Sequence, residues 1–241
     1  MRIYSDLADW YPLLTPLADY VEEAPTYLAI FKQFLPTGRK TLLELGAGAG
    51  HNAFYFRDDF ELTLTDLQTE MLAMAQRNCP EALCVQGDMR TLRLGRQFDA
   101  VFIHDAINYL LTERDLELAL QTAEAHLKPG GVLLIAPDYV QETFTPHANT
   151  DGTDGEGRSL RYLEWTWQRA GQLDRYVADY TLVMRTGDAE PVVVNDRHEE
   201  GLFPRATWLR LLADLGLEPL EPAIAEADHP DLFLVRKAAV R

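Results

Sequence analysis

The sequence predicts an α/β protein with a doubly wound, mostly parallel seven-stranded sheet, helices on both of its faces, and a small antiparallel β insertion. Up to residue 137, short apolar segments typical of buried strands alternate with amphipathic helical segments, which is the pattern of a parallel sheet. After Pro137 the chain becomes rich in β-branched and aromatic residues without a helical period, which predicts antiparallel strands after the fifth parallel strand. We therefore expect a core formed by residues 1–137 and 199–241, and an inserted unit at 138–198.

The charge and the cysteine content limit the classes of binding partner and the cellular compartment that we expect. The 241 residues include 22 Lys and Arg against 38 Asp and Glu, a net charge of −16. Such a chain lacks the basic face that nucleic acid requires, so we expect no nucleic-acid partner. Cys79 and Cys84 form no metal or disulfide pattern and predict free thiols in a reducing cytoplasm. We see no signal peptide and no apolar run of about 18 residues, so we expect no membrane span. The oligomeric state is left open, with a homodimer as one alternative.

The first 38 residues predict helices that cover the core ahead of the first strand. Pro12 and Pro16 break up any long helix at the start of the chain. A longer amphipathic helix follows, which Pro36-Thr-Gly38 ends, and apolar residues at i, i+3, i+4 and i+7 form its buried face: Tyr27, Ile30, Phe31 and Phe34.

The core elements follow in regular alternation. The first strand, residues 41–45, leads through a glycine-rich loop into a short helix at 52–57. Lys128-Pro-Gly-Gly131 is expected to stop a helix and turn the chain into the fifth strand. The further predicted strands are residues 61–65, 82–85, 99–103, 132–136 and 232–235. Three further helices are predicted. The first spans residues 69–78. The second is capped by Thr112 with Asp115 and has one apolar face formed by Leu116, Leu120, Ala123 and Leu127, and the third carries Trp208, Leu211, Leu212 and Leu215 and is closed by Gly216.

The insertion is predicted to hold antiparallel strands at residues 161–168, 176–185 and 191–196. An acidic, glycine-rich run at 151–157 links them to the core. This run lacks the residue order of a calcium-binding loop, so we expect a mobile loop there.

The stretch Thr41-Leu-Leu-Glu-Leu-Gly-Ala-Gly-Ala-Gly-His-Asn52 predicts a ligand-binding loop. Glycine lets a ligand approach the backbone closely, and free N–H groups at the following helix start are expected to face that ligand. Dinucleotide sites have the spacing G-x-G-x-x-G, whereas here Gly46, Gly48 and Gly50 occupy every second position. Glu44 precedes them, and its carboxylate suits a cation better than a pyrophosphate.

Two more acids follow predicted strands, where ligands of open α/β sheets bind. Asp66 ends the second strand and can accept hydrogen bonds from both hydroxyls of a ribose; an ordinary helix cap is the alternative. Asp88 follows the third strand and can accept from an adenine amino group, with the Met89 N–H reaching a ring nitrogen; the alternative is a common Gly-Asp turn.

The pattern E-x-G-x-G-x-G at residues 44–50, followed in order by Asp66, Gly87-Asp-Met89, Phe98-Asp99 and His126-Leu-Lys-Pro-Gly-Gly131, resembles the class I S-adenosylmethionine-dependent methyltransferases. The resemblance implies a Rossmann-like fold and S-adenosyl-L-methionine as cofactor. More narrowly, Pro80 to Phe98 resembles small-molecule N-methyltransferases that dimethylate nucleotide-linked amino sugars, in which inserted strands roof the acceptor pocket as a lid. The match is loose in residues 145–200, which leaves the acceptor open. The cofactor-binding residues implied are Tyr20, Glu44, Gly46, Ala47, Gly48, Gly50, Asp66, Leu67, Met71, Asp88, Met89 and His104.

The candidates for catalysis come from the same resemblance and from position. In these relatives an N-terminal tyrosine comes near the reactive methyl group, and Tyr11 is the best match, with packing of the N-terminal helix as the alternative. If the acceptor is an amine that arrives protonated, His104 can take its proton, with Asp105 as the second candidate; a carboxylate acceptor needs no base. The acceptor-binding candidates are Asn108, Tyr109 and His198, the last with a structural role as the alternative.

Two other functions stay open at this point. The chain could be a nicotinamide-dependent oxidoreductase, although Glu44 and the early third glycine disfavour it, or a non-catalytic protein that binds the cofactor with the same fold. We expect a small-molecule acceptor and no metal, because no two of the six histidines have ligand spacing.

Overall fold

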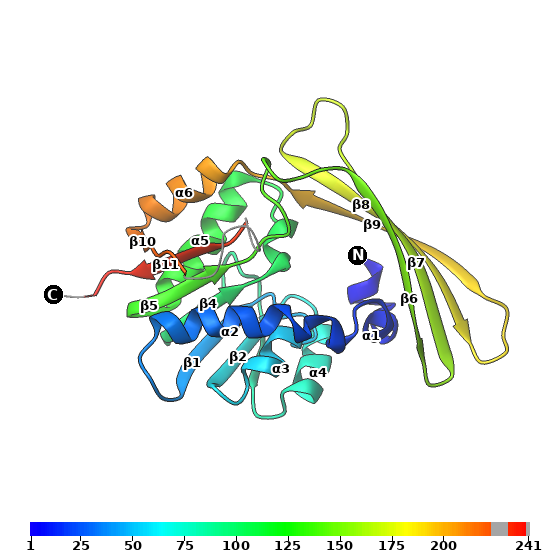
Figure 1. Ribbon diagram of the computed structural model, residues 1–241, viewed down its shortest axis with the longest axis horizontal. Coiled ribbons are helices and arrows are strands. Elements are labelled where there is room, and N and C mark those ends of the chain that lie inside the picture. Colours follow the sequence, from blue (N-terminus) through cyan, green and yellow to red (C-terminus); the bar gives the residue numbers. More distant parts are fainter. Residues whose placement is uncertain (223–230, 240–241) are drawn as a thin grey trace.

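The computed structural model describes residues 1–222 and 231–239. Its central sheet is built around strands that are apolar on both faces. Its strands are β1 (Lys40–Leu45), β2 (Phe60–Asp66), β3 (Leu83–Gln86), β4 (Phe98–Ile103), β5 (Leu127–Ile135), β10 (Leu217–Pro219) and β11 (Phe233–Lys237). They lie in the order β10-β11-β5-β4-β1-β2-β3, in which β11 alone runs opposite to the other six strands (Figure 1). The predicted α/β fold with a mostly parallel seven-stranded sheet is confirmed.

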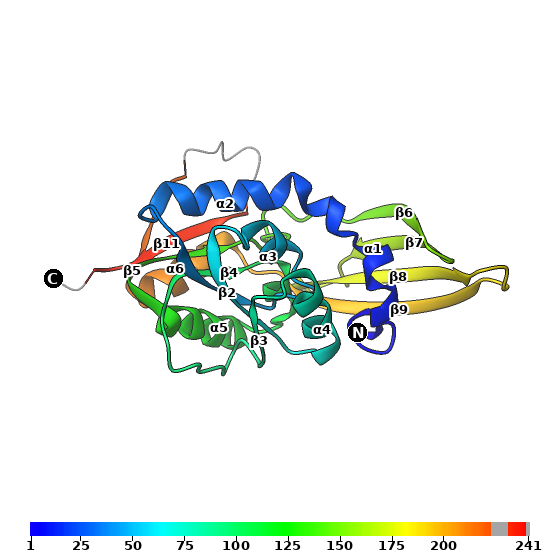
Figure 2. The ribbon, with the colours of Figure 1, turned by 90° about the horizontal axis from the view of Figure 1, so that it is seen from below.

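Helices cover both faces of this sheet (Figure 2). On one face lie α2 (Glu23–Phe34), α3 (His51–Phe56) and α4 (Thr69–Asn78), and on the other α5 (Glu113–His126) and α6 (Arg205–Asp214). Successive residues of a strand point to opposite faces, so Leu42 packs with the α2 side and Leu43 with the α5 side. Burial of both faces fixes the register of the strands, and thereby the loops at their carboxyl ends.

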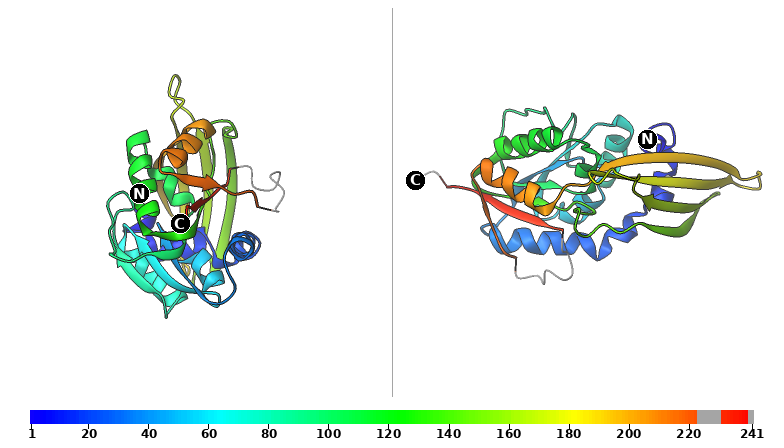
Figure 3. Two further views of the ribbon diagram at one scale, coloured as in Figure 1. Left: turned by 90° about the vertical axis from the view of Figure 1, so that its left-hand side faces the viewer. Right: turned by 90° about the horizontal axis from the view of Figure 1, so that it is seen from above.

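The inserted strands form a second sheet that projects from the core (Figures 1 and 3). It consists of β6 (His147–Gly155), β7 (Arg158–Trp167), β8 (Arg175–Thr186) and β9 (Val192–Gly201), in sequence order and antiparallel. The antiparallel insertion is thus confirmed, and its last strand continues to Gly201, beyond the predicted boundary at residue 198.

The prediction of a mobile loop at residues 151–157 is wrong, because residues 151–155 belong to β6 and pair with β7. Gly152 lies so close to its partner strand that an added Cβ would come within 2.4 Å of the Leu160 carbonyl oxygen. Its missing side chain therefore serves close strand pairing, and the turn is confined to Glu156 and Gly157.

The connection between α5 and β5 also differs from the prediction. We expected Leu127 on the helix and the fifth strand to begin at Val132. In the structure Leu127 already pairs with Phe98 of β4, whereas Val132 pairs with Ala100. The intervening residues 128–131 therefore form a bulge within β5, and the helix ends one residue earlier than expected.

Short helical turns fill the start of the chain, as the two prolines predict: η1 (Arg2–Tyr4), η2 (Ala8–Trp10), α1 (Tyr11–Leu14) and η3 (Leu17–Val21). They lie between the core and the second sheet (Figure 1). None of the helices in the described ranges has the length and apolar content needed to span a bilayer. The predicted core segment 199–241 includes residues 223–230 and 240–241, which lie outside the described residues.

Candidate active site

The three loop glycines serve different physical purposes. All three have positive φ, at 76° for Gly46, 52° for Gly48 and 74° for Gly50. A Cβ on Gly46 would lie 2.3 Å from the Ala106 Cβ, and one on Gly50 would lie 3.1 Å from Ala75, so these two glycines allow close packing of the loop. A Cβ on Gly48 would have only the Tyr11 hydroxyl nearby, at 3.9 Å. Gly48 is therefore the position where a side chain would project into open space.

The N–H groups of Gly46, Ala47 and Gly48 are bound within the protein, so these three donors are not free to face a ligand. The Gly46 and Ala47 N–H groups both donate to the Thr65 carbonyl at 2.8 Å. The Gly48 N–H donates to the Asp66 carboxylate, also at 2.8 Å. A loop whose donors are occupied is poorly suited to an anion, so the cavity chemistry is set by the side chains around it.

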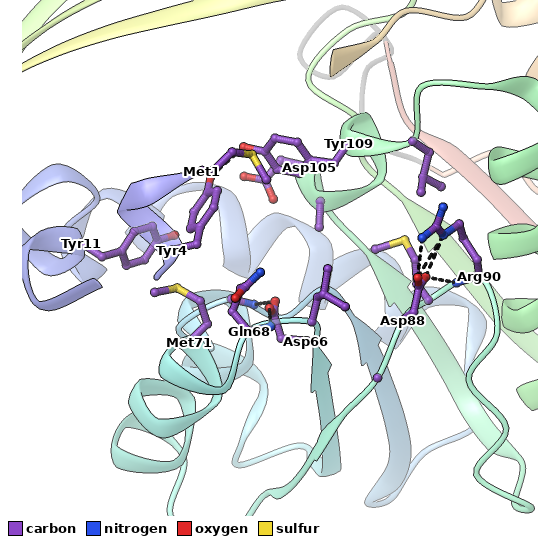
Figure 4. A pocket seen from close by; sticks show the side chains of 17 residues that line it. Met1, Tyr4, Tyr11, Asp66, Gln68, Met71, Asp88, Arg90, Asp105 and Tyr109 are labelled. Atoms are coloured by element: carbon purple, nitrogen blue, oxygen red, sulfur yellow. Dashed lines mark hydrogen bonds and ion pairs between the residues drawn. The ribbon is translucent and has the colours of Figure 1, made fainter. Parts of the chain in front are cut away.

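Two adjoining cavities open at the carboxyl ends of β1, β2 and β4, and four residues line both: Tyr11, Gly46, Gly48 and Asp105. The first also holds Asp66, Leu67, Met71, Asp88, Met89 and Tyr109 (Figure 4). The second holds Tyr20, Glu44, Ala47 and His104. The structure thus brings together the predicted site residues, except for Gly50, Asn108 and His198, which line neither cavity.

Glu44 contributes a buried carboxyl group near the end of β1. Only 2% of the residue is exposed, and its Oε2 atom has no hydrogen-bond partner among the described residues. Desolvation by burial raises the pKa of Glu44 to about 8, although the positive charge of His104 opposes this shift. A cation in the second cavity would supply the missing partner and favour the ionised carboxylate. His51, whose Nδ1 also lacks a described partner, lines the same cavity.

Asp66 at the end of β2 and Asp88 after β3 differ in how many hydrogen bonds their carboxylates already accept from the protein (Figure 4). Each carboxylate oxygen of Asp66 accepts one backbone N–H, from Gly48 and Gln68, both at 2.8 Å, so lone pairs remain for ribose hydroxyls. The Asp88 carboxylate accepts three hydrogen bonds from the Arg90 guanidinium, of 3.0, 3.1 and 2.6 Å, and one from the Arg90 N–H. Asp66 is therefore the freer acceptor.

His104 cannot serve as the proton acceptor that the sequence predicted. Its Nε2 contacts the Glu23 carboxylate, and its Nδ1 lies 3.3 Å from Asp105 Oδ1. Burial alone would lower the pKa of His104, but the charges of Asp105 and Glu23 hold the pKa well above its ordinary value. The imidazole is thus already protonated near neutral pH. Its positive charge in turn lowers the pKa of Asp105 against the effect of burial, so Asp105 is an ionised carboxylate that lines both cavities.

Asn108 and His198, predicted to bind the acceptor, lie behind the cavity wall. His198 is 2% exposed. Its Nδ1 is 2.9 Å from the Tyr109 hydroxyl and its Nε2 is 3.2 Å from Asp196 Oδ2, so both ring nitrogens have protein partners. Asn108, also buried, donates to the Tyr176 hydroxyl at 3.4 Å. His198 thus positions Tyr109, which does line the cavity.

The sequence analysis missed two residues that shape the site. Tyr4 lines the first cavity, and its hydroxyl lies 2.8 Å from that of Tyr109. Glu23 fixes the charge on His104 from the start of α2. The aromatic-rich N-terminus was a signal for Tyr4. Nothing in the local sequence connects Glu23 to a residue that lies 81 positions away.

Comparison with known proteins identifies the family. A family model described as a methyltransferase domain matches residues 42–131. The chain is 31% identical over 205 residues to dTDP-3-amino-3,6-dideoxy-alpha-D-glucopyranose N,N-dimethyltransferase from Streptomyces fradiae, covering 83% of this chain and 78% of that protein. It is 32% identical over 182 residues to dTDP-3-amino-3,4,6-trideoxy-alpha-D-glucopyranose N,N-dimethyltransferase from Streptomyces venezuelae, covering 73% and 76%. The chain belongs to the class I S-adenosylmethionine-dependent methyltransferases.

Solved structures agree with this assignment. DesVI from Streptomyces venezuelae superposes with a TM-score of 0.80 at 26% identity, covering 91% of this chain and 92% of that one. CalS10, an amino pentose methyltransferase from Micromonospora echinaspora solved with S-adenosylmethionine bound, gives 0.76 at 25% identity, covering 91% and 92%. The methyltransferase assignment decides against the oxidoreductase and the non-catalytic binding protein. The methyl donor of this methyltransferase is S-adenosylmethionine, and the methyl acceptor is a small molecule.

The residues of the methyltransferase fit that donor. The unpartnered Glu44 oxygen suits its ammonium group, Asp66 keeps lone pairs for its ribose, and the apolar side chains of Leu67 and Met89 suit its adenine. We keep these contacts as predictions for the individual residues. Tyr11, which the resemblance places near the reactive methyl group, lines both cavities.

Proposed function

We propose that the methyltransferase transfers its methyl group to an amine nitrogen of a small-molecule acceptor, and that Asp105 binds and deprotonates that amine. The position and ionisation of Asp105 carry the proposal. It lines both cavities, and 47% of its side chain is exposed. The imidazolium of His104 keeps it charged. The names of the Streptomyces relatives, which are N,N-dimethyltransferases of amino sugars, support an amine acceptor.

The chemistry assigns a separate task to each side chain. S-adenosylmethionine supplies a methyl group on a positively charged sulfur, which needs only a free lone pair in line with it. An ammonium acceptor has no such lone pair. Asp105 takes one proton from the nitrogen and so exposes the pair. His104 and Glu23 act as positioning residues that hold Asp105 charged, and Tyr4, Tyr11 and Tyr109 surround the reacting atoms.

We further propose that residues 138–198 form a roof over the acceptor. The contact between Tyr109 and His198 of β9 supports this role, because it brings the second sheet against the cavity wall. The cytoplasmic location and the homodimer stay predictions.

The proposal is tested by methyl transfer to a matched pair of acceptors. We expect S-adenosylhomocysteine and an N-methyl product from a 3-amino hexose, and neither from the same sugar with a hydroxyl at that carbon. In Asp105→Asn we expect kcat/KM to fall by about 10²–10⁴-fold, the usual contribution of a proton-transferring group, while the protein still binds S-adenosylhomocysteine.

The control is Asp214→Asn, which changes an exposed carboxylate at the end of α6 that pairs with Arg210. It should retain wild-type activity. Product from the hydroxyl sugar, or full activity in Asp105→Asn, would contradict the proposal.

A further inference from the structure

A chain of hydrogen bonds runs from the first cavity into the second sheet. Tyr4 and Tyr109 line this cavity, and their hydroxyl oxygens lie 2.8 Å apart. The Tyr109 oxygen lies 2.9 Å from Nδ1 of His198 in β9, whose Nε2 lies 3.2 Å from Asp196 Oδ2. His198 and Asp196 are buried. In the described part of the chain the two hydroxyls have no further hydrogen-bond partner, so this chain alone decides how their protons are oriented.

The buried end of the chain fixes the tautomer of His198. Desolvation by burial lowers the pKa of His198 below its ordinary value of 6.5, although Asp196 opposes the shift. The imidazole is therefore neutral at pH 7 and carries one N–H group. The Asp196 carboxylate can only accept hydrogen bonds, and its Oδ2 atom also accepts one from the Ile3 N–H at 3.0 Å. The proton of His198 thus lies on Nε2, and Nδ1 presents a lone pair to Tyr109.

This tautomer sets the direction of the remaining hydrogen bonds. Burial raises the pKa of both Tyr4 and Tyr109, so each hydroxyl is neutral and has a single proton to donate. Tyr109 donates its proton to His198 Nδ1. The bond between the two hydroxyls can then form only with Tyr4 as the donor and the Tyr109 oxygen as the acceptor. Both protons are used within the protein, and the two hydroxyls offer only oxygen lone pairs to the cavity.

These lone pairs lie near the carboxylate to which the proposed function assigns the amine. In Figure 4 Tyr4, Tyr109 and Asp105 lie above the cavity, and Asp66, the predicted ribose acceptor, lies below it. After desolvation and Tyr11, the charge of Asp105 is the next cause of the raised pKa of Tyr4, so the carboxylate and the hydroxyl interact. The side of the cavity that carries Asp105 therefore also carries two hydroxyl oxygens that can only accept.

An amine nitrogen can satisfy both kinds of acceptor. A primary ammonium group that gives one proton to Asp105 gains a lone pair and keeps two N–H groups. If one of these N–H groups donates to the Tyr4 oxygen, the amine can no longer rotate freely. The lone pair is then held in line with the methyl group, which is the geometry that methyl transfer needs.

We infer that Tyr4 is a specificity-determining residue, which accepts a hydrogen bond from an N–H group of the methyl acceptor. Tyr109, His198 and Asp196 are positioning residues that keep the Tyr4 proton turned away from the acceptor. This inference rests on the proposed function and adds a second binding group for the amine nitrogen besides Asp105. A site whose polar groups can only accept disfavours a ligand without a donor, because these groups are then left unpaired.

The direction of the chain can be tested without a substrate. NMR spectra of the full chain with isotope-labelled histidine, recorded at neutral pH, identify which ring nitrogen carries the proton. The signals of His198 are recognised by contacts with the Tyr109 ring, whose centroid lies 5.8 Å away, and by their loss in His198→Gln. We expect a proton on Nε2 and none on Nδ1. A proton on Nδ1 would overturn the inference, whatever the enzyme methylates.

The role of Tyr4 is tested by calorimetry on the full chain saturated with S-adenosylhomocysteine. One probe is the methyl glycoside of 3-amino-3,6-dideoxy-D-glucopyranose, and the other is the same glycoside with fluorine in place of the amino group, which cannot donate. Tyr4→Phe should weaken binding of the amino glycoside about tenfold, which corresponds to about 1.4 kcal/mol. Binding of the fluoro glycoside and of S-adenosylhomocysteine should not weaken. An unchanged affinity for the amino glycoside, or no binding of it by the wild type, would overturn the inference.

The matched control is Tyr55→Phe, which removes a hydroxyl that donates to the Leu17 carbonyl at 3.2 Å. Like Tyr4→Phe, it removes one hydroxyl contact between the N-terminal segment and the core, but Tyr55 is not among the described residues that line the two cavities. It should bind the amino glycoside like the wild type. Equal losses in the two variants would contradict a specific role of Tyr4. Weaker S-adenosylhomocysteine binding in Tyr4→Phe would place its hydroxyl against the methyl donor instead.

The proposed function fails in a different way. Full activity in Asp105→Asn, together with the expected loss of glycoside affinity in Tyr4→Phe, would overturn the base and leave the hydrogen bond from the amine to Tyr4. Loss of activity in Asp105→Asn, together with wild-type glycoside affinity in Tyr4→Phe, would keep the proposed function and overturn only the inference about Tyr4.

Discussion

The two ligand-facing regions of this methyltransferase are built in different ways. The cofactor region is assembled from loops that directly follow β1, β2 and β3, so Glu44, Asp66 and Asp88 each lie at a strand end. The acceptor region joins segments far apart in the chain: Tyr4 meets Tyr109, and the Ile3 N–H binds Asp196 across 193 positions. The first region depends on local loop geometry, whereas the second depends on how the second sheet and the N-terminus dock.

The largest expected effect concerns the glycine loop, in which Gly48 faces the cavities and Gly46 packs against Ala106. Gly48→Val should abolish S-adenosylhomocysteine binding in calorimetry, because its side chain enters the open space shared by both cavities. The positive φ adds a strain of about 1–3 kcal/mol, and the protein should still unfold cooperatively. Gly46→Val is the contrasting variant. Its Cβ would overlap with Ala106, so we expect a lower melting temperature than for Gly48→Val. Retained binding in Gly48→Val would place the ligand elsewhere.

A smaller effect compares the two acids of the cofactor region. Asp66→Ala should weaken S-adenosylhomocysteine binding by about 1–3 kcal/mol, since it strands the polar groups that the carboxylate serves. Asp88→Ala should cost less, because the Asp88 oxygens are largely occupied by Arg90. Both affinities are measured by calorimetry. A larger loss for Asp88→Ala would reverse the assignment of the freer acceptor.

The pH dependence of donor binding reports on Glu44. Its pKa of about 8 means that the carboxyl is mostly protonated at pH 7 without ligand. Binding of a cation favours the ionised form, so binding should release a proton at pH 7 and should weaken by up to about tenfold per pH unit below 8. Calorimetry in buffers of different ionisation enthalpy measures this release. Glu44→Gln should abolish it, and an unchanged release in that variant would contradict the role of Glu44.

The raised pKa of Glu44 has the opposite effect on the stability of the unliganded protein, which falls as the pH rises while donor affinity increases. A carboxyl whose folded pKa is raised binds its proton more tightly when folded, so its stabilising contribution is present below the ordinary value of 4.5 and is lost as the pH rises through about 8. Denaturant unfolding across this range should show that loss in the wild type and a smaller loss in Glu44→Gln.

The smallest expected effect concerns the acceptor region. His104→Gln removes the charge that lowers the pKa of Asp105, so Asp105 should become protonated at higher pH. The acidic limb of the kcat/KM profile should therefore move to higher pH. The control is His147→Gln, which changes an exposed histidine of β6, and its limb should not move. An acidic limb that stays in place in His104→Gln would contradict the positioning role of His104.

The comparison between the regions also explains what the sequence could predict. Strand burial and glycine spacing are local signals, so β1 to β4, the second half of β5, and the places of Glu44 and Asp66 at strand ends were predicted correctly. The proton state of His104 depends on Glu23, and the burial of His198 depends on Asp196 and Tyr109. These contacts form only on tertiary packing, which no local pattern encodes. For the same reason the glycines of residues 151–157 predicted flexibility, although Gly152 serves the close approach of two strands.

The position of the N-terminal segment has a consequence for turnover. Tyr11 lines both cavities, and the same segment is tied to the second sheet through Ile3 and through the Asp9 carbonyl, which accepts from Arg158 at 3.0 Å. In the proposed function, the segment that covers the donor cavities is thus tied to the second sheet that roofs the acceptor. Release of either product requires the same few contacts to open, so the residence times of the two products should rise and fall together.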